Sequence, residues 1–473
     1  MAGLARVLRM RDLFSLLFGT IVGVGWIAAS GGWIAQAGPV GAIVAFAGGA
    51  VVMTMIGLCY GEVMAALPEA SGAVGYALFA FGERMAFATG WFLTLTYATS
   101  IAFFVVTVSW LVEAVAGPAM GPVLYTVFGS GVHAGPTAIA AVLAVALAFA
   151  NQRGTETAAG LQNVAVVMKI FLAVLLGLAA CANGRSAHLV PLLGSDTGWH
   201  RPLAIGAVMV TTPFWFAGFD VLPQAIRERR GDLDLSRLGR LIAGTIGAAL
   251  LFYGMVIFAA SSLLPRPELL AAGLPTFHAF RAGLGVPALA QAVIVLGIIG
   301  LVTSWNATLF SAARVLQALG AARLLPRWVG VRHPRLATPA RAVWMMTAIG
   351  MGLGLAGPNA VNTLLEAASI SIVVTFIVLC AGLLRMRRRS PGRIGPYRVP
   401  GAWFARLAIV LSIGLLGLSI ADPIAGPGPF RVPAAWLIVI IWSVLGLVSW
   451  RLDVGRRDSM TSAERAAVLV GSD

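Results

Sequence analysis

Lys169 is the residue whose type and position most clearly suggest chemistry, because it is the only lysine in 473 residues. It lies midway along an uncharged apolar stretch, Thr157 to Ala182, that is long enough to cross a membrane. The nearest polar exits, Glu156 and Asn183, are 13 and 14 residues away, which is roughly 20 Å along a helix in either direction. A lysine side chain cannot reach that far, so its ammonium group is expected to face a protein interior, a water-filled cavity or an ion site. The alternative is a lysine with a purely structural role.

The composition indicates a polytopic membrane protein. Hydrophobic residues make up 59% of the chain and charged residues only 11%, whereas a globular protein carries roughly a quarter charged residues. Most of the 33 basic residues fall on the membrane side that carries the N-terminus. Only five lie on the opposite side, namely Arg185, Arg201, Arg266, Arg281 and Arg431. This asymmetry follows the positive-inside rule and predicts a multi-pass protein of the cytoplasmic (inner) membrane with both termini in the cytoplasm.

The net charge of +15 would suggest nucleic-acid binding in a soluble protein. Here the basic clusters Arg227–Arg240 and Arg385–Arg389 flank predicted spans. We interpret them as topology signals that contact lipid headgroups of the surrounding bilayer. A nucleic-acid partner is not expected.

Long apolar stretches predict an all-α fold with twelve transmembrane helices. The predicted spans cover residues 13–36, 40–66, 87–116, 135–151, 157–182, 203–225, 239–264, 285–320, 341–357, 360–384, 403–421 and 434–450.

Spans 1 and 6 contain helix-breaking residues at matching places. Span 1 carries Gly19-Thr-Ile-Val-Gly23-Val-Gly25-Trp26, and span 6 carries Pro213-Phe-Trp-Phe-Ala-Gly218-Phe-Asp220. Glycine weakens a helix and proline removes a backbone donor, so both spans are expected to break in the middle of the bilayer. Interrupted spans at the start of each group of five point to an inverted-repeat transporter with a site at the midplane. Close helix packing is the alternative reason for glycines in membrane helices.

Other classes of protein find little support. The cysteines Cys59, Cys181 and Cys380 lack metal or disulfide spacing and are interpreted as packing residues, and the five histidines fall in loops. The chain contains no His-Glu-x-x-His and no Gly-x-Ser-x-Gly motif, so we expect no enzyme activity, no cofactor and no metal site. A channel would need a continuous polar pore, which these apolar spans do not offer.

Five motifs occur in a characteristic order along the chain. They are GTIVGVGWI at 19–27, YGEVMAALPEASGAVGY at 60–76, NQRG at 151–154, FAGFD at 216–220 and NATLFSAARVLQALGAARLLP at 306–326, followed by Thr338-Pro339. Each motif is weak alone, whereas the ordered set from span 1 to span 9 is fairly specific. Together they resemble the amino acid–polyamine–organocation (APC) superfamily of secondary transporters.

The resemblance implies a LeuT-type fold, in which two inverted repeats of five helices are followed by two further helices. Its segments would be a cytoplasmic N-terminus (1–12), the first repeat (13–182), an extracellular loop (183–202), the second repeat (203–384), helices 11 and 12 (385–450) and a cytoplasmic tail (451–473). The substrate would lie between helices 1 and 6, with helices 3, 8 and 10 around it. Proton-coupled relatives are similar in carrying a lysine in helix 5, and Lys169 matches that position.

The two breaks suit a zwitterionic substrate. The helix that starts after Gly23-Val24-Gly25 would offer free amides to a carboxylate, and carbonyls near Phe214 would accept hydrogen bonds from an ammonium group. We expect Phe214 to gate the substrate, and Val24 and Trp26, which depart from the family pattern, predict a tight aromatic cavity. The expected substrate-binding residues are Gly23, Val24, Gly25, Trp26, Tyr97, Phe214, Trp215, Phe216, Gly218, Asp220 and Thr308.

The acidic residues near the site leave alternatives open. Asp220 could take a proton, bind a cationic group or cap the second half of helix 6. Glu366 in span 10 could face the cavity and favour a cationic substrate, whereas an all-apolar lining would favour a neutral amino acid. Glu62 and Glu113, near the ends of spans 2 and 3, are predicted to be interfacial.

We predict a proton or cation site at Lys169 that includes Gly19, Thr20 and Ser304. Burial disfavours the charged form of an amine, so Lys169 could exchange its proton near physiological pH. The ammonium group would bind helix 1 carbonyls and helix 8 hydroxyls when protonated, and would release them when deprotonated. A permanently charged lysine that replaces an ion structurally is an equally simple interpretation.

The leading hypothesis is a proton-coupled amino acid symporter that works by alternating access. An amine, polyamine or ethanolamine transporter and a pH-independent amino acid exchanger are the alternatives. The sequence leaves the substrate, the stoichiometry and the oligomeric state open. The tail after Arg451 is predicted to be disordered.

Overall fold

The computed structural model describes most of the chain. The described residues are 9–116, 121–153, 158–194, 200–223, 233–272, 274–285, 287–336, 338–393, 395–425, 433–452 and 454–471.

The structure consists mainly of long helices. They are α1 (Met10–Ile21), α2 (Gly25–Ala66), α4 (Glu83–Ala116), α5 (Ala134–Arg153), α6 (Ala158–Asn183), α7 (His200–Phe216), α9 (Leu238–Leu263), α12 (Pro287–Ala321), α13 (Ala340–Gly354), α14 (Val361–Arg389), α15 (Gly401–Ala425) and α16 (Ala434–Leu452). The shorter helices are α3 (Gly72–Phe81), α10 (Arg266–Ala271), α11 (Pro275–Leu284), α17 (Val454–Arg457) and α18 (Ser462–Leu469). Short 3-10 turns include η2 (Phe219–Val221), and the strands are β1 (Val123–Val127) and β2 (Ser130–His133).

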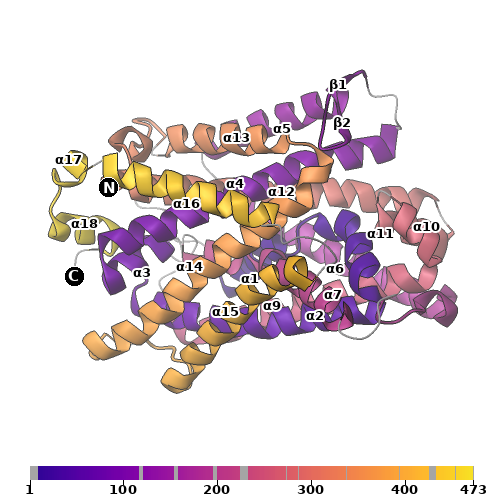
Figure 1. The fold of residues 1–473 in the computed structure, drawn as a ribbon, viewed down its shortest axis with the longest axis horizontal. Coiled ribbons are helices and arrows are strands. Elements are labelled where there is room, and N and C mark those ends of the chain that lie inside the picture. Colours follow the sequence, from indigo (N-terminus) through magenta and orange to yellow (C-terminus); the bar gives the residue numbers. More distant parts are fainter. Residues whose placement is uncertain are drawn as a thin grey trace.

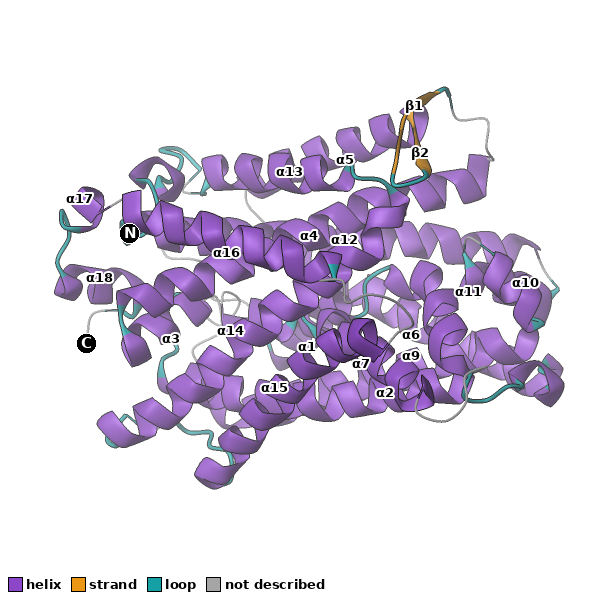
Figure 2. Cartoon of the chain, in the orientation of Figure 1, coloured by secondary structure: helices purple, strands orange, loops and turns teal. Residues whose placement is uncertain are grey.

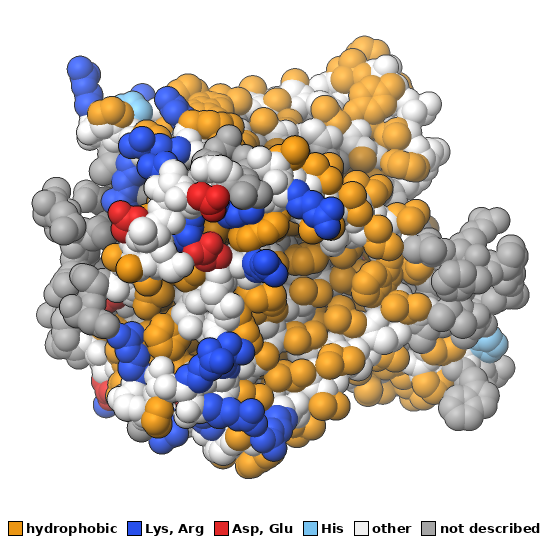
Figure 3. Space-filling model, turned by 60° about the vertical axis from the view of Figure 1, so that its left-hand side comes forward, with side chains coloured by type: hydrophobic (Ala, Val, Ile, Leu, Met, Phe, Trp, Pro, Cys, Tyr) orange, Lys and Arg blue, Asp and Glu red, His pale blue; other side chains and the backbone are white. Residues whose placement is uncertain are grey.

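The long helices lie side by side as one bundle, with short elements at its two ends (Figure 1). α3, α17 and α18 lie at one end, and α10, α11 and the β1–β2 hairpin lie at the other. The hairpin is the only sheet within the described residues (Figure 2). On the face drawn in Figure 3, basic side chains gather at one end and apolar side chains cover most of the remainder. This is the surface expected of a bundle that crosses a membrane.

Ten helical segments among the described residues are long and apolar enough to cross a membrane. The prediction of an all-α, multi-pass membrane protein is therefore confirmed. α1, with 12 residues, and α13, with 15, are shorter than a full span. The count of twelve spans stays a prediction.

α2 joins two predicted spans. It contains 42 residues, and a straight helix of that length would be about 63 Å long, twice the hydrocarbon core of about 30 Å. The chain turns instead at Gly38, whose φ is +74°, directly before Pro39. A Cβ at Gly38 would lie 2.2 Å from the Gly194 amide nitrogen, so only glycine fits there. α2 thus holds the second half of span 1 and all of span 2.

The packing of the helices positions the two predicted breaks. α2 packs along α7 and α9, while α1 packs against α6, α9 and α12. α4 packs along α12, α13 and α14, and α14 also contacts α7. The ends of α1 and α7 therefore face α4 and α12 across the middle of the bundle.

The prediction that the C-terminal tail is disordered is wrong. α17 and α18 form there, and α18 packs against α3 and α12. Arg465 of α18 is only 3% exposed, because distant parts of the chain accept its hydrogen bonds. Composition alone does not reveal such partners.

The structure adds detail to further residues of the sequence analysis. Glu62 is buried, pairs with Arg387 at 2.5 Å and accepts from the Val399 amide at 2.7 Å; its position at the membrane interface stays a prediction. Cys59 and Cys380 are buried, whereas Cys181 is exposed. The side chain of Glu113 lies outside the part of the chain that the structure describes.

Candidate functional site

The first break separates α1 from α2. α1 ends at Ile21, and Val22, Gly23 and Val24 lie outside helical structure before α2 begins at Gly25. Carbonyl groups beside such a break lose their helical partners. An unsatisfied polar group in hydrocarbon is costly, so these carbonyls need donors from elsewhere.

Lys169 on α6 supplies such a donor. Its side chain is buried, and Nζ lies 2.6 Å from the Val22 oxygen and 3.4 Å from the Gly19 oxygen. Ser304 on α12 donates to the same Gly19 oxygen at 3.0 Å. Gly300 leaves room for the lysine, because a Cβ there would lie 2.8 Å from Lys169 Cε. The predicted group of Lys169, Gly19 and Ser304 is thus joined by hydrogen bonds.

Two aromatic side chains donate hydrogen bonds to other carbonyls of the break. The Tyr253 hydroxyl on α9 lies 2.8 Å from the Ile21 oxygen and 3.2 Å from the Trp215 oxygen. Its single proton is therefore shared between α1 and α7. The indole nitrogen of Trp26 donates to the Gly23 oxygen at 3.1 Å. Each of these bonds stabilises backbone that helical structure leaves unpaired.

The second break follows α7. α7 ends at Phe216, and Gly218, with φ +146°, leads into η2. Asp220 accepts a hydrogen bond from the Gly218 amide at 2.8 Å and another from the Tyr97 hydroxyl on α4. A Cβ on Gly218 would lie 2.8 Å from Ile21 Cγ1. The two breaks therefore touch, and glycine permits the contact.

A cavity of about 60 Å³ lies between the two breaks. It is lined by Thr20, Ile21, Gly23, Val24, Gly25, Thr96, Tyr97, Ser100, Phe103, Phe104, Phe214, Trp215, Ala217, Gly218, Asp220, Val221, Tyr253, Ser304, Thr308 and Ile372. Asp220 is the one acidic residue in this lining, which otherwise consists of hydroxyl, aromatic, aliphatic and backbone groups. Lys169 lies behind the α1 break and reaches the cavity only through the carbonyls that it binds.

Most of the predicted site residues line this cavity. They are Thr20, Gly23, Val24, Gly25, Tyr97, Phe214, Trp215, Gly218, Asp220, Ser304 and Thr308. Of the helix 1 carbonyls predicted near Gly19 and Thr20, Lys169 contacts that of Gly19, and its second contact is the Val22 oxygen; the Thr20 hydroxyl donates to the Leu16 oxygen at 2.7 Å.

Three predicted residues lie elsewhere. Trp26 is buried against Phe252, with ring centroids 5.3 Å apart, because its indole bond turns the ring away from the cavity. Phe216 packs on Phe46 and Tyr253, each at 5.8 Å. Glu366 is half-buried on α14 and is not part of the lining. The carboxylate of Asp220 is therefore not joined by a second one.

Sequence reasoning missed several lining residues. Those with polar or aromatic side chains are Thr96, Ser100, Phe103 and Phe104 on α4 and Tyr253 on α9; the aliphatic ones are Ile21, Ala217, Val221 and Ile372. A signal was present on α4, because the run Thr-Tyr-Ala-Thr-Ser at 96–100 is polar within an apolar span. Tyr253 offered a weaker signal, namely a hydroxyl deep in span 7 that needs a partner.

The arrangement combines two helix ends with opposite partial charges. The N-terminus of α2 brings the positive end of its dipole to the cavity, and the C-terminus of α7 brings a negative end. A ligand with a carboxylate and an ammonium group is complementary to this pair. An ionisable side chain, Lys169, is attached to the backbone between them.

Comparisons with known proteins point to one family. A family profile described as amino acid permease matches residues 8–448. The chain is 24% identical over 428 residues to the methylthioribose transporter of Bacillus subtilis, which covers 87% of each chain. It is 24% identical over 422 residues to the branched-chain amino acid permease BcaP of the same organism, which covers 84% of each chain. It is also 24% identical over 467 residues to the L-asparagine permease of Streptomyces coelicolor, which covers 95% of this chain and 90% of that protein.

The contact between Gly25 and Trp215 provides a test of this geometry. A Cβ at Gly25 would lie 2.2 Å from the Trp215 ring. We predict that Gly25→Ala lowers the free energy of unfolding by about 1–3 kcal/mol, the usual cost of overpacking. Adding Ala at this position should cost nothing further in a Trp215→Leu background, where the ring is absent. Thermal unfolding of the four proteins in detergent measures both effects.

Gly244→Ala is the matched control, because a Cβ at Gly244 would meet nothing within 4 Å. This helical glycine on α9 should tolerate alanine or gain stability from it. Equal unfolding midpoints for Gly25→Ala and Gly244→Ala would contradict the close approach of α2 and α7.

Proposed function

The chain belongs to the amino acid permease family, and we propose that it is a secondary active transporter that moves amino acids across the cytoplasmic membrane by alternating access. We further propose that transport is a symport with protons and that Lys169 forms the proton site. The observation that carries this proposal is the pair of hydrogen bonds from Lys169 Nζ to the Gly19 and Val22 oxygens. They connect an ionisable group to the helix break that borders the cavity.

The two helix ends provide for the common part of any amino acid. The first amides of a helix have no internal partners, so the start of α2 at Gly25 attracts a carboxylate. The last carbonyls of α7, those of Phe214 and Trp215, already accept from the Ala217 amide and the Tyr253 hydroxyl. Each oxygen has a second lone pair, and the negative end of the α7 dipole attracts an ammonium group to it. A zwitterion between these ends needs no charged side chain for either contact.

The remaining lining supports a neutral amino acid as the substrate. Six aromatic side chains narrow the cavity: Tyr97, Phe103, Phe104, Phe214, Trp215 and Tyr253. The Asp220 carboxylate already accepts hydrogen bonds from Tyr97 and Gly218, so capping of the break accounts for it. The names of the three relatives differ in substrate, so the cavity rather than the comparison carries this inference.

Phe214 is the side chain that we assign to the gate. Its ring makes edge-to-face contacts with Phe103, at 5.7 Å, and with Trp215, at 4.9 Å. A rotation of Phe214 would therefore open one wall of the cavity without breaking a hydrogen bond. Edge-to-face pairs contribute only about 0.5–1.5 kcal/mol each, which is small enough for such a movement.

The proton enters this scheme through the backbone of the α1 break. A protonated Lys169 donates charge-assisted hydrogen bonds to Val22 and Gly19 and holds α1 against α6 and α12. A neutral amine donates weaker bonds, so loss of the proton loosens α1. The group of α1, α2, α7 and α9 can then move against α4 and α12, which alters access to the cavity.

The orientation follows from charge. We call the end of the bundle that holds α3, α17 and α18 the arginine-rich end, and we propose that it faces the cytoplasm.

The proposed proton site leads to a transport prediction. We expect Lys169→Met, whose unbranched side chain is one atom shorter and cannot hold a proton, to abolish accumulation driven by an acidic exterior. A lost hydrogen bond to a charged group amounts to about 1.5–3 kcal/mol, so the initial rate should fall by roughly 10- to 100-fold. Uptake of labelled amino acids into proteoliposomes, with and without a pH gradient, measures this rate.

The control for this experiment is Met168→Ala on the same helix, at an exposed position. It should transport like the wild type. Accumulation by Lys169→Met that still follows the pH gradient would contradict the assignment of the proton site to Lys169. Uptake only against preloaded substrate, indifferent to pH in both proteins, would indicate the exchanger with a structural lysine. No uptake of amino acids by the wild type in either mode would favour amines and polyamines.

Asp220 allows a second test. If its carboxylate caps the break, Asp220→Asn keeps an oxygen for the Gly218 amide and should retain uptake of neutral amino acids. Asp220→Ala loses that oxygen and should lower the free energy of unfolding by about 0.5–2 kcal/mol. Uptake assays and thermal unfolding of both variants separate these effects. Loss of all transport in a stably folded Asp220→Asn protein would show instead that the charge takes part in transport.

A further inference from the structure

The C-terminal tail is a folded element with its own start signal. α18 begins after Thr461, whose side chain accepts from the Glu464 amide at 3.2 Å, while Glu464 accepts from the Thr461 amide at 2.7 Å. This capping box defines the first turn of α18 locally.

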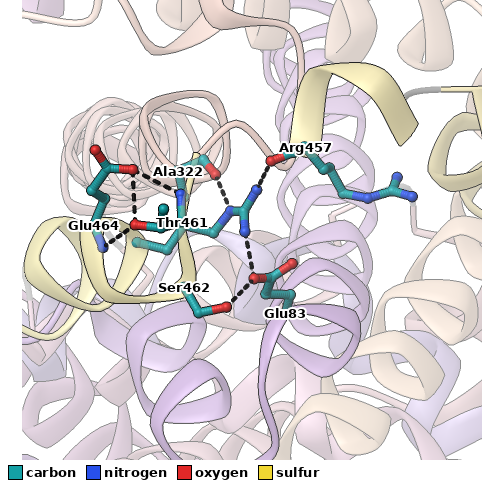
Figure 4. A network of polar contacts seen from close by, with 7 residues as sticks. Glu83, Ala322, Arg457, Thr461, Ser462 and Glu464 are labelled. Carbon is teal, nitrogen blue, oxygen red and sulfur yellow. Dashed lines mark hydrogen bonds and ion pairs between the residues drawn. The ribbon is translucent and has the colours of Figure 1, made fainter. Parts of the chain in front are cut away.

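Hydrogen bonds of Arg465 connect α18 to the rest of the protein, and Figure 4 labels the residues that accept them, Glu83, Ala322 and Arg457. The guanidinium group of Arg465 donates to the Ala322 oxygen after α12 at 3.0 Å, to Glu83 at the start of α4 and to the Arg457 oxygen. Ser462 donates to the same Glu83 oxygen at 3.0 Å. Because Arg465 is only 3% exposed, removing it would leave several buried polar groups without a donor.

The seated tail forms one wall of a second cavity. This cavity has a volume of about 770 Å³ and lies between α3, the end of α16 and α18, at the arginine-rich end. Three arginines line it, Arg84, Arg393 and Arg457, together with one acidic residue, Glu83. The Glu83 carboxylate is already paired with Arg465, which is not part of the lining. The cavity therefore attracts an anion.

Aromatic rings stand beside these guanidinium groups. Arg393 lies 5.3 Å from the ring centroid of Phe79, and Arg457 lies 3.8 Å from that of Trp450. Phe79 and Trp450 are also part of the lining. A ligand that fills this space must have an apolar portion as well as an anionic one.

Apolar side chains make up much of the remaining lining of this cavity. They are Leu78, Phe79 and Phe81 of α3, Trp450 near the end of α16, and Ala466 and Val470 of the tail. Guanidinium groups and apolar side chains therefore line the same space. A phospholipid presents both matching parts, a phosphate group and acyl chains.

We propose that this cavity binds the phosphate group of an anionic membrane phospholipid. Arginine forms paired hydrogen bonds to phosphate oxygens, and anionic lipids concentrate in the leaflet that the arginine-rich end would face. Free phosphate pairs with the arginines but leaves Phe79, Trp450 and the other apolar side chains of the lining uncovered. The docked tail is part of the site, because Arg457 and one wall belong to it. This inference rests on the proposed orientation of the chain in the membrane and is independent of its substrate.

The test measures lipid binding to the purified full-length protein in detergent by native mass spectrometry. The probes are phosphatidylglycerol, phosphatidylcholine and inorganic phosphate. The wild type should retain phosphatidylglycerol in preference to phosphatidylcholine. Arg84→Gln combined with Arg393→Gln should weaken phosphatidylglycerol binding by roughly 10- to 30-fold, since each basic contact at a membrane surface contributes about fivefold. Arg465→Ala, which unseats α18, should weaken it as well.

The matched control removes the same charge outside the cavity. Arg335→Gln combined with Arg341→Gln changes two exposed arginines that do not line it, and lipid binding should stay unchanged. An equal loss in both double variants would overturn the site, because surface charge alone would then explain binding. Equal retention of phosphatidylglycerol and phosphatidylcholine would overturn it too. Displacement of phosphatidylglycerol by inorganic phosphate at the same concentration would replace the lipid with free phosphate as the ligand.

Discussion

The structure depends on how broken backbone is satisfied in the absence of water. An α-helix pairs its own polar groups, and a break in the bilayer leaves carbonyls that hydrocarbon cannot pair. At the end of α1 these carbonyls find Lys169, Ser304 and Tyr253 on three other helices. The break is therefore a junction at which α1 is attached to α6, α12 and α9.

One of the three donors differs from the others in kind. The hydroxyls of Ser304 and Tyr253 stay neutral at any pH of a living cell. In the proposed mechanism Lys169 exchanges a proton, and the strength of its bond to Val22 would then depend on its protonation state. This places a variable attachment next to fixed ones at the same backbone segment. A conformational change that starts there alters both the position of α1 and the wall of the cavity, because Gly23 and Val24 belong to that wall.

The sequence predicts the features that depend on local interactions, and it does not predict those that depend on contacts between residues far apart in the chain. The two helix breaks could be predicted, because Gly23, Gly25 and Pro213 weaken helical structure at their own positions. The role of Lys169 could also be predicted, because a lysine isolated in an apolar stretch can place its ammonium group in few environments. The role of Tyr253 could not be predicted, since it depends on the Ile21 and Trp215 carbonyls, which only helix packing brings together. Trp26 was predicted to line the cavity. Its ring packs on Phe252 instead, and its indole nitrogen donates to the Gly23 oxygen. The order of the C-terminal tail could not be predicted for the same reason as the role of Tyr253. Arg465 holds α18 in place through hydrogen bonds to Glu83 and to the Ala322 carbonyl, which are far from it in the sequence.

Proton movement caused by the substrate tests the central claim most directly. The protein would be reconstituted into liposomes that hold a pH-sensitive dye, with no pH gradient and with the membrane potential held at zero. Our account predicts that addition of substrate acidifies the interior of wild-type liposomes in proportion to the substrate taken up. Liposomes with Lys169→Met should show no acidification above the leak. Substrate uptake by the wild type without acidification, or equal acidification with Lys169→Met, would contradict a proton site at Lys169.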